Sequence, residues 1–117
     1  MTLALGNVTF DCQNSADELA EFYAQLLDRP VDPEASAFFA TVGQTSGASP
    51  VLMFIQVPDK TPGKNVVHLD FHSVQWRDYV ERAISLGAKH IGDFDEYGQQ
   101  WVTLADPEGN LFDIGKE

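Results

Sequence analysis

The sequence repeats one order of strand and helix signals at an interval of about 60 residues. The stretches 8–11 (Val-Thr-Phe-Asp) and 67–70 (Val-His-Leu-Asp) align without a gap, and a helical pattern follows each of them. A unit of this length is too small to bury a good core alone, so we expect the two units to complete each other's core. The prediction is one domain over residues 1–117, with similar halves at about 5–59 and 66–115.

In both halves, the pattern of apolar and polar residues predicts a strand that leads into an amphipathic helix. In the first half, residues 8–12 alternate apolar and polar, and Ser15 and Glu18 stand at the spacing of a capping box. The apolar face of the following helix comprises positions 19, 22, 23, 26 and 27, and Arg29-Pro30 ends it. The second half has a strand over 67–71 and an apolar helix face at positions 76, 79, 80, 83 and 84, followed by Gly87.

Further strands complete each half. We expect them at 37–42 and 51–57 in the first half, and at 89–94, 100–104 and 111–114 in the second. Asp106–Asn110 predicts a hairpin turn, because Pro107 presets φ and Gly109 readily adopts a positive φ. This order of a strand, a helix and then strands favours an α+β fold over a doubly wound α/β sheet.

Acidic residues outnumber basic ones by 18 to 7, which gives a formal net charge of −11. Nucleic acids and anionic membranes are bound through Lys and Arg patches, so we expect neither as a partner. The acidity favours solubility or, alternatively, a cationic ligand. No leader pattern and no apolar run of about 20 residues is present, so we predict a cytoplasmic location. The lone Cys12 lies in an apolar stretch and is expected to be a buried, inert thiol.

Three segments together carry a resemblance to a known family. They are the Phe22-Tyr23 pair on the first helix, the His68-Leu69-Asp70 strand and the Asp106–Asn110 turn. In this order and spacing they closely resemble glyoxalase-like domains of the vicinal-oxygen-chelate superfamily, which includes glyoxalases, bleomycin resistance proteins and dioxygenases. The resemblance covers nearly the whole chain and is weakest around residues 33–50.

The resemblance implies an α+β fold of two βαβββ modules that form an incomplete mixed β-barrel with the helices outside. It also implies a small-molecule ligand in a central cleft and a homodimer. Many members hold a divalent metal ion in that cleft, whose ligands project inward from the first and last strands of each half; no organic cofactor is expected.

The implied metal site is incomplete in this chain. By resemblance, His68 and Asp113 match ligand positions of the family, and Gln56 matches a third one loosely. Thr9 stands where the family has His or Gln. Catalytic metal sites usually use at least three protein ligands, so we predict at most weak binding of a divalent metal. Two alternatives stay open for His68: a hydrogen-bonded core residue, or a metal-free contact to the ligand that includes acid–base work.

Three further residues are candidates for ligand contact. Asp11 and Asp70 occupy matched inward positions, where facing carboxylates act as acid and base or, alternatively, bond backbone groups at the strand ends. Trp101 is interpreted as a cleft wall or as a surface for a flat ligand. His72 and His90 have no partner visible in the sequence and are interpreted as surface or edge residues.

These residues leave three functional hypotheses. The first is an enzyme of lyase, isomerase or dioxygenase type, though not a true glyoxalase I, because that reaction needs a complete set of four metal ligands. The second is a non-catalytic protein that sequesters an antibiotic-type small molecule. The third is a stand-alone domain with a regulatory role.

Overall fold

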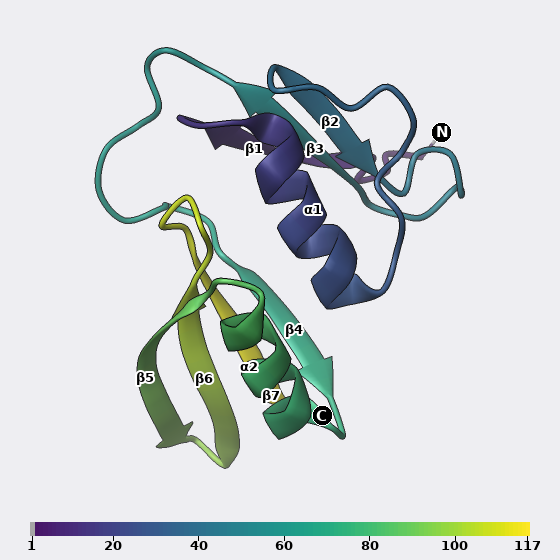
Figure 1. Ribbon diagram of the computed structural model, residues 1–117. Coiled ribbons are helices and arrows are strands. Elements are labelled where there is room, and N and C mark those ends of the chain that lie inside the picture. Colours follow the sequence, from purple (N-terminus) through teal and green to yellow (C-terminus); the bar gives the residue numbers. More distant parts are fainter. Residues whose placement is uncertain (1) are drawn as a thin grey trace. The chain divides into compact units, whose positions relative to one another are not determined.

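The computed structural model describes residues 2–117, which form two units that meet in sequence at Lys60 and Thr61. Each unit has one helix packed against one face of one sheet (Figure 1). Both sheets mix parallel and antiparallel strands, and neither closes into a barrel. The predicted α+β class is therefore confirmed. A single domain over both halves stays a prediction, because each unit is determined by itself.

Unit 1 contains β1 (Asn7–Cys12), α1 (Ala16–Leu27), β2 (Phe39–Val42) and β3 (Val51–Gln56). The strand order is β1-β3-β2, with β1 parallel and β2 antiparallel to β3. Only two strands follow α1, and a single bridge between Val31 and Val42 takes the place of the third strand of a βαβββ module. Pro30 and Pro33 flank Val31 and supply no N–H groups, so a longer ladder cannot form there.

The apolar face of α1 packs on the unit 1 sheet, where the Tyr23 and Phe54 ring centroids lie 6.0 Å apart. Ser15 is the N-cap, as predicted, but its side chain makes no capping hydrogen bond. Instead, the Ala16 N–H donates to the Ala37 carbonyl at 2.8 Å. The chain that enters β2 thus satisfies a donor of the first helical turn that has no partner within the helix.

Asp32 is buried in unit 1 and anchors the loop between β2 and β3. Its Oδ2 accepts hydrogen bonds from Thr41 Oγ1 at 2.7 Å and from the Gln44 N–H at 2.9 Å. Its Oδ1 accepts one from the Thr45 N–H at 3.1 Å. Burial acts to raise the pKa of Asp32, but these hydrogen bonds together outweigh it and hold the pKa below its usual value. A hollow of about 380 Å³ lies beside Asp32, and both carboxylate oxygens are already engaged by these hydrogen bonds.

Unit 2 contains β4 (Leu69–Ser73), α2 (Trp76–Ser85), β5 (Lys89–Glu96), β6 (Gln99–Ala105) and β7 (Leu111–Lys116). The strand order is β4-β7-β6-β5, in which β4 and β7 are parallel and the other neighbours antiparallel. This half has the full βαβββ order. The helix covers one face of the sheet (Figure 1), where Leu104, Phe112 and Ile114 are buried. The other face of the sheet carries the exposed and half-buried side chains.

The turn between β6 and β7 forms as the sequence predicts. Gly109 has a φ of 87°, and Asp106 Oδ1 accepts the N–H groups of Glu108 at 2.8 Å and Asn110 at 3.0 Å. This carboxylate therefore holds the turn that sets the register of β7 against β6.

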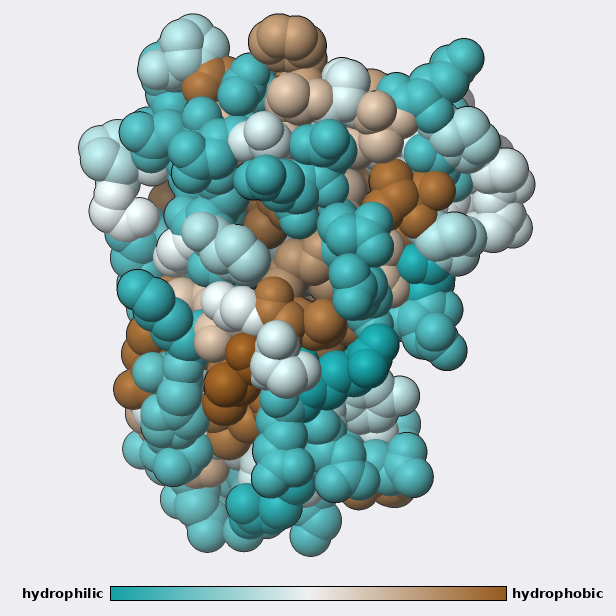
Figure 2. Space-filling model, in the orientation of Figure 1, coloured by the Kyte–Doolittle hydropathy of each residue, from teal (hydrophilic) through white to brown (hydrophobic). Residues whose placement is uncertain are grey.

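The surface reflects the acidic, polar composition. Figure 2 shows that hydrophilic residues cover much of the visible face, with hydrophobic residues exposed between them. Val66 and Val67, ahead of β4, are 92% and 76% exposed. Cys12 is fully buried, which confirms the prediction for this thiol. Over residues 2–117, no helix is long and apolar enough to cross a membrane.

Candidate functional site

Three polar side chains lie in a row across the open face of the unit 2 sheet. The parallel pairing of β4 and β7 sets Asp70 opposite Asp113, and the antiparallel pairing of β6 and β7 sets Thr103 opposite Asp113. Alternation along each strand sends their neighbours to the helix face, where Phe112 and Ile114 are buried. Burial of the apolar set therefore turns the polar set to the open face.

His68 completes a cluster with the two carboxylates. Its Nδ1 lies 3.1 Å from Asp70 Oδ1 and 3.8 Å from Asp113 Oδ2. Thr103 Oγ1 donates to Asp113 Oδ1 at 2.6 Å. One Asp113 oxygen is thus held by the hydroxyl, which leaves the other to face the imidazole and Asp70.

Asp113 is the electrostatically perturbed member of the cluster. Its side chain is 19% exposed, whereas those of His68 and Asp70 are 44% and 54% exposed. Burial raises the pKa of Asp113 above its usual value, and the neighbouring Asp70 carboxyl raises it further. The Thr103 hydrogen bond and the charge of His68 lower the pKa but do not cancel these effects.

The donor set of the cluster fits a divalent metal ion. His68, Asp70 and Asp113 each offer one ligand atom, and these atoms lie within 4.8 Å of one another. Ligand atoms about 2.0–2.2 Å from one ion are at most about 4.4 Å apart, so a small rotation of the two exposed side chains suffices. One imidazole and two carboxylates suit Zn²⁺, Mn²⁺ or Fe²⁺. In the described part of the chain, no other group of three His, Cys, Asp or Glu side chains has this geometry.

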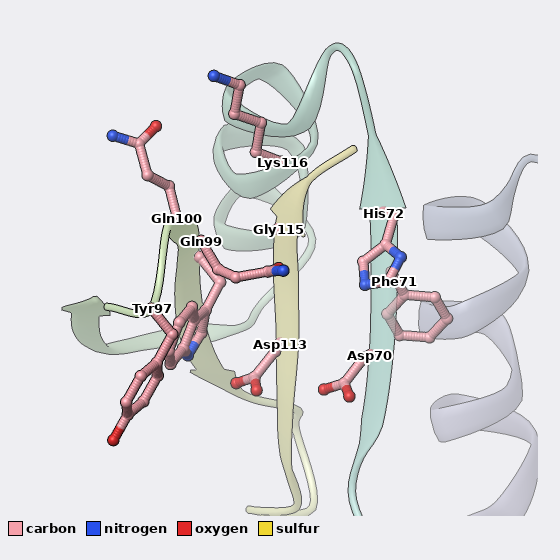
Figure 3. Close-up of a pocket in the computed structure, with 10 residues that line it drawn as sticks. Asp70, Phe71, His72, Tyr97, Gln99, Gln100, Asp113, Gly115 and Lys116 are labelled. Atoms are coloured by element: carbon pink, nitrogen blue, oxygen red, sulfur yellow. The ribbon is translucent and has the colours of Figure 1, made fainter. Parts of the chain in front are cut away.

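The two carboxylates also line a pocket of about 280 Å³ on the same face (Figure 3). Figure 3 shows the carboxylates of Asp70 and Asp113 side by side on neighbouring strands. Gly115 pairs with His72 on one side and Trp101 on the other. A Cβ at Gly115 would lie 3.2 Å from both Trp101 Cβ and the Gln100 carbonyl oxygen, so a larger residue there would crowd the pocket lining.

Aromatic rings form the other end of the pocket. Trp101 on β6 stacks on Phe94 of β5, with ring centroids 5.3 Å apart and planes 13° from parallel. Tyr97, at the tip of the β5–β6 hairpin, also lines the pocket and is 93% exposed. The pocket thus offers acidic groups at one end and flat apolar surfaces at the other.

The structure brings four of the predicted site residues together in unit 2. These are His68, Asp70, Trp101 and Asp113. The residue that lies with His68 and Asp113 in this unit is Asp70, which was predicted as a ligand contact, whereas the predicted metal set was His68, Asp113 and Gln56.

The other two predicted residues lie in unit 1. Asp11 is exposed on β1, with the neighbouring Phe10 stacked on Phe54 under α1. Gln56 has the same strand parity as Phe54, and its Nε2 donates to the Asn14 carbonyl at 3.2 Å. A contribution of Asp11 or Gln56 to the site remains a prediction.

Several residues of the site were not predicted from the sequence, among them Thr103, His72 and Tyr97. Thr103 lies two positions from Trp101 on β6, so strand alternation could have placed it on the same face. His72 lies two positions from Asp70 and could have been found by the same argument, although we interpreted it as a surface residue. Tyr97 carries no local signal, because a hairpin tip contributes to a pocket only through the tertiary fold.

Three solved structures show what the fold is similar to. A glyoxalase/bleomycin resistance protein/dioxygenase family enzyme from Burkholderia phytofirmans has a TM-score of 0.80 at 20% identity, covering 97% of this chain and 98% of that one. The fosfomycin resistance protein FosX from Listeria monocytogenes has a TM-score of 0.77 at 14% identity, covering 100% and 95%. The lactoylglutathione lyase from Agrobacterium tumefaciens has a TM-score of 0.68 at 13% identity, covering 98% and 94%.

At these identities the likeness shows the fold alone. No curated protein sequence matches the chain significantly. The model of a family described as a glyoxalase-like domain matches residues 7–115, which include every helix and nearly every strand residue described above. The chain therefore belongs to the glyoxalase-like domain family of the vicinal-oxygen-chelate superfamily.

Proposed function

We propose that the protein binds a small, oxygen-bearing molecule in the unit 2 pocket, next to a divalent metal ion held by His68, Asp70 and Asp113. The observation that carries the proposal is the convergence of one imidazole and two carboxylates beside a pocket of about 280 Å³. Small-molecule sites are concave and use a few converging polar groups to orient the ligand. This pocket combines such polar groups, including Asp70 and Asp113, with the aromatic surface of Trp101. The names of two solved relatives, lactoylglutathione lyase and FosX, also refer to small organic molecules.

The chain's own residues prepare such a site in three ways. Asp70 and Asp113 face each other, and their repulsion favours a cation between them. Thr103 holds Asp113 Oδ1, which leaves Oδ2 to point at the cluster. His68 offers Nδ1 from the chain just ahead of β4. When bound, the ion would supply Lewis acidity toward an oxygen of the small molecule.

The exposure of two of the three ligands limits the affinity of the site. His68 and Asp70 are about half exposed, so solvent competes for both, and three protein ligands leave positions for water or substrate. We therefore expect reversible metal binding that is weaker than in a closed four-ligand site. A true glyoxalase I activity stays unexpected on the same ground.

Calorimetric titration of chelator-treated protein with Mn²⁺ and Zn²⁺ tests the metal site. Wild type should bind one equivalent, and His68→Ala and Asp113→Asn should each lose most of the affinity. His90→Ala is the matched control, because His90 Nε2 lies 2.9 Å from Asp93 Oδ1 in an exposed pair on β5 without a third ligand. The proposal fails if wild type binds no metal, or if His90→Ala loses as much affinity as His68→Ala.

A second candidate function is metal-free sequestration of a cationic small molecule of antibiotic type. The observations in its favour are the net charge of −11 and the facing carboxylates of Asp70 and Asp113, which would receive an ammonium group. Titration with bleomycin in the presence of EDTA separates the two candidates. Binding that EDTA leaves intact and Asp113→Asn removes supports sequestration, whereas no heat above dilution argues against it.

We further propose that the protein is a homodimer in the cytoplasm. The dimer is supported by Val66 and Val67, two exposed apolar side chains ahead of β4 that favour self-association. The location is supported by the single buried thiol of this acidic chain, which suits a reducing compartment. Sedimentation velocity at micromolar concentration tests the assembly. A single species of 12.9 kDa, the mass of one chain, would contradict it.

A further inference from the structure

Tyr97 is placed where a tyrosine strains the backbone. It precedes Gly98 at the tip of the β5–β6 hairpin, and the two residues have φ values of 56° and 74°. Two central residues with positive φ are typical of a tight hairpin turn that favours Asn or Gly. A tyrosine is strained in this left-handed region because its Cβ crowds the backbone.

The Tyr97 side chain gains nothing in the unit that would offset this strain. It is 93% exposed, so its ring buries almost no apolar surface. A strained residue with an exposed aromatic ring needs another explanation, and strain of this kind is typical of ligand contacts. The position supports that explanation, since Tyr97 lines the unit 2 pocket and Figure 3 shows its ring at the pocket's edge.

Trp101 provides a second aromatic surface in the same pocket, and it is held in place. Its ring stacks on Phe94 at 5.3 Å, and its backbone pairs with Gly115 on β7. The Tyr97 ring has no such packing partner at 93% exposure, so it is free to adjust. One fixed and one adjustable ring suit a flat, unsaturated group, which presents a face to each ring.

We propose that Tyr97 is a specificity-determining contact, whose ring packs on a flat, unsaturated part of the bound molecule while Trp101 forms the fixed wall. The inference rests on the proposed binding of a small molecule in the unit 2 pocket and adds the class of ligand. That class has oxygen donors for the His68–Asp70–Asp113 cluster and a conjugated ring that reaches the hairpin tip. Molecules with the same donors on a saturated ring should bind less tightly.

A matched pair of probes tests the ligand class. Benzohydroxamate and cyclohexanecarbohydroxamate carry the same oxygen donors on a flat and on a puckered ring. In the presence of Zn²⁺, wild type should bind the flat probe about 2- to 10-fold more tightly, the range expected for one aromatic contact. Tyr97→Asn should lower this preference, because only the Trp101 ring then remains beside the flat group, and Tyr97→Phe should keep it. Phe38→Asn is the control, because it removes another largely exposed ring, in unit 1.

The same variants test the backbone strain by a readout independent of ligand. Asparagine adopts a positive φ readily, so Tyr97→Asn should unfold at a higher urea concentration than wild type, while Tyr97→Phe should not differ from it. If Tyr97→Asn is more stable than wild type but prefers the flat probe less, the tyrosine contributes to binding at a cost in stability.

The outcomes separate this inference from the proposed function. If both probes bind and Asp113→Asn weakens both, but Tyr97→Asn keeps the ring preference, the pocket stands and the role of Tyr97 is overturned. If neither probe binds wild type, the proposed function fails and this inference fails with it. If Tyr97→Asn instead lowers the sedimentation coefficient, the ring contacts a second copy of the chain, which also overturns the inference.

Discussion

Replacing Asp32 by asparagine tests whether one buried carboxylate holds the β2–β3 loop of unit 1. The carboxylate accepts three hydrogen bonds, two at Oδ2 and one at Oδ1. Asparagine has a single carbonyl oxygen, which best replaces Oδ2 and keeps the bonds from Thr41 and Gln44. Its amide nitrogen then faces the Thr45 N–H, a donor against a donor. At least one hydrogen bond to a charged acceptor is therefore lost.

A hydrogen bond to a charged group contributes about 1.5–3 kcal/mol to stability. We expect the free energy of unfolding of unit 1 to fall by this amount in Asp32→Asn. The Thr45 amide should then exchange with deuterium about 10- to 100-fold faster, since about 1.4 kcal/mol corresponds to a factor of ten. Amide exchange by NMR reports this locally, and urea unfolding followed by far-ultraviolet circular dichroism reports the whole unit. Tryptophan fluorescence does not report on it, because Trp76 and Trp101 lie in unit 2.

The lowered pKa of Asp32 predicts how this loss depends on pH. A carboxyl group with a lower pKa in the folded state stabilises that state above the unfolded pKa, and this contribution is lost as the pH falls through the folded pKa. The stability gap between wild type and Asp32→Asn should therefore be full at neutral pH and shrink below about pH 4.

Glu34→Gln is the matched control, because it removes an exposed carboxylate two residues away that receives none of the three hydrogen bonds. Unchanged exchange of the Thr45 amide in Asp32→Asn would refute the reasoning. So would an equal loss of stability in Glu34→Gln, or a gap that widens as the pH falls.

Three more predictions concern unit 2 and the thiol. Thr103→Val removes a hydrogen bond that lowers the pKa of Asp113, so that pKa should rise further in a ¹³C NMR titration of the carboxyl; a fall would contradict the site geometry. Leu104→Ala removes a fully buried side chain and should lower the free energy of unfolding by about 2–5 kcal/mol, measured by tryptophan fluorescence in urea. A loss under about 1 kcal/mol would show that the core relaxes around the gap. Cys12 should react with a thiol reagent only after unfolding, and rapid stoichiometric labelling of the native protein would contradict its burial.

Local patterns were sufficient for most of the secondary structure. The helix stripes predicted α1 and α2, and the Asp106–Asn110 turn formed with Gly109 in the expected conformation. One prediction was wrong in detail. The Ser15 side chain does not cap α1, because the chain entering β2 supplies an acceptor to the helix start. In the first half, the remaining strand of the module is reduced to the bridge between Val31 and Val42, next to Pro30.

The candidate site was predicted in part. His68, Asp70, Asp113 and Trp101 were named from the sequence, but as members of two different sets. The resemblance assigned His68 and Asp113 to a metal with Gln56, and it assigned Asp70 to ligand contact. The register of β4 against β7 brings Asp70 level with Asp113, and this register is not encoded in either strand alone.

The sequence by itself determined the repeated order of elements, the buried face of α1 and the acidic character of the protein. The first two depend on the spacing of residues along the chain, which sets the face that each side chain occupies. The predicted apolar face of α2 is buried only in part, because Tyr79 and Ile84 are exposed. Only the tertiary structure decided which polar side chains meet. Strands distant in sequence pair so as to bury Phe112 and Ile114 under α2, and alternation then turns Asp70, Asp113 and Thr103 together onto the open face. The Tyr97 hairpin tip reaches the same pocket for the same reason, through strand pairing.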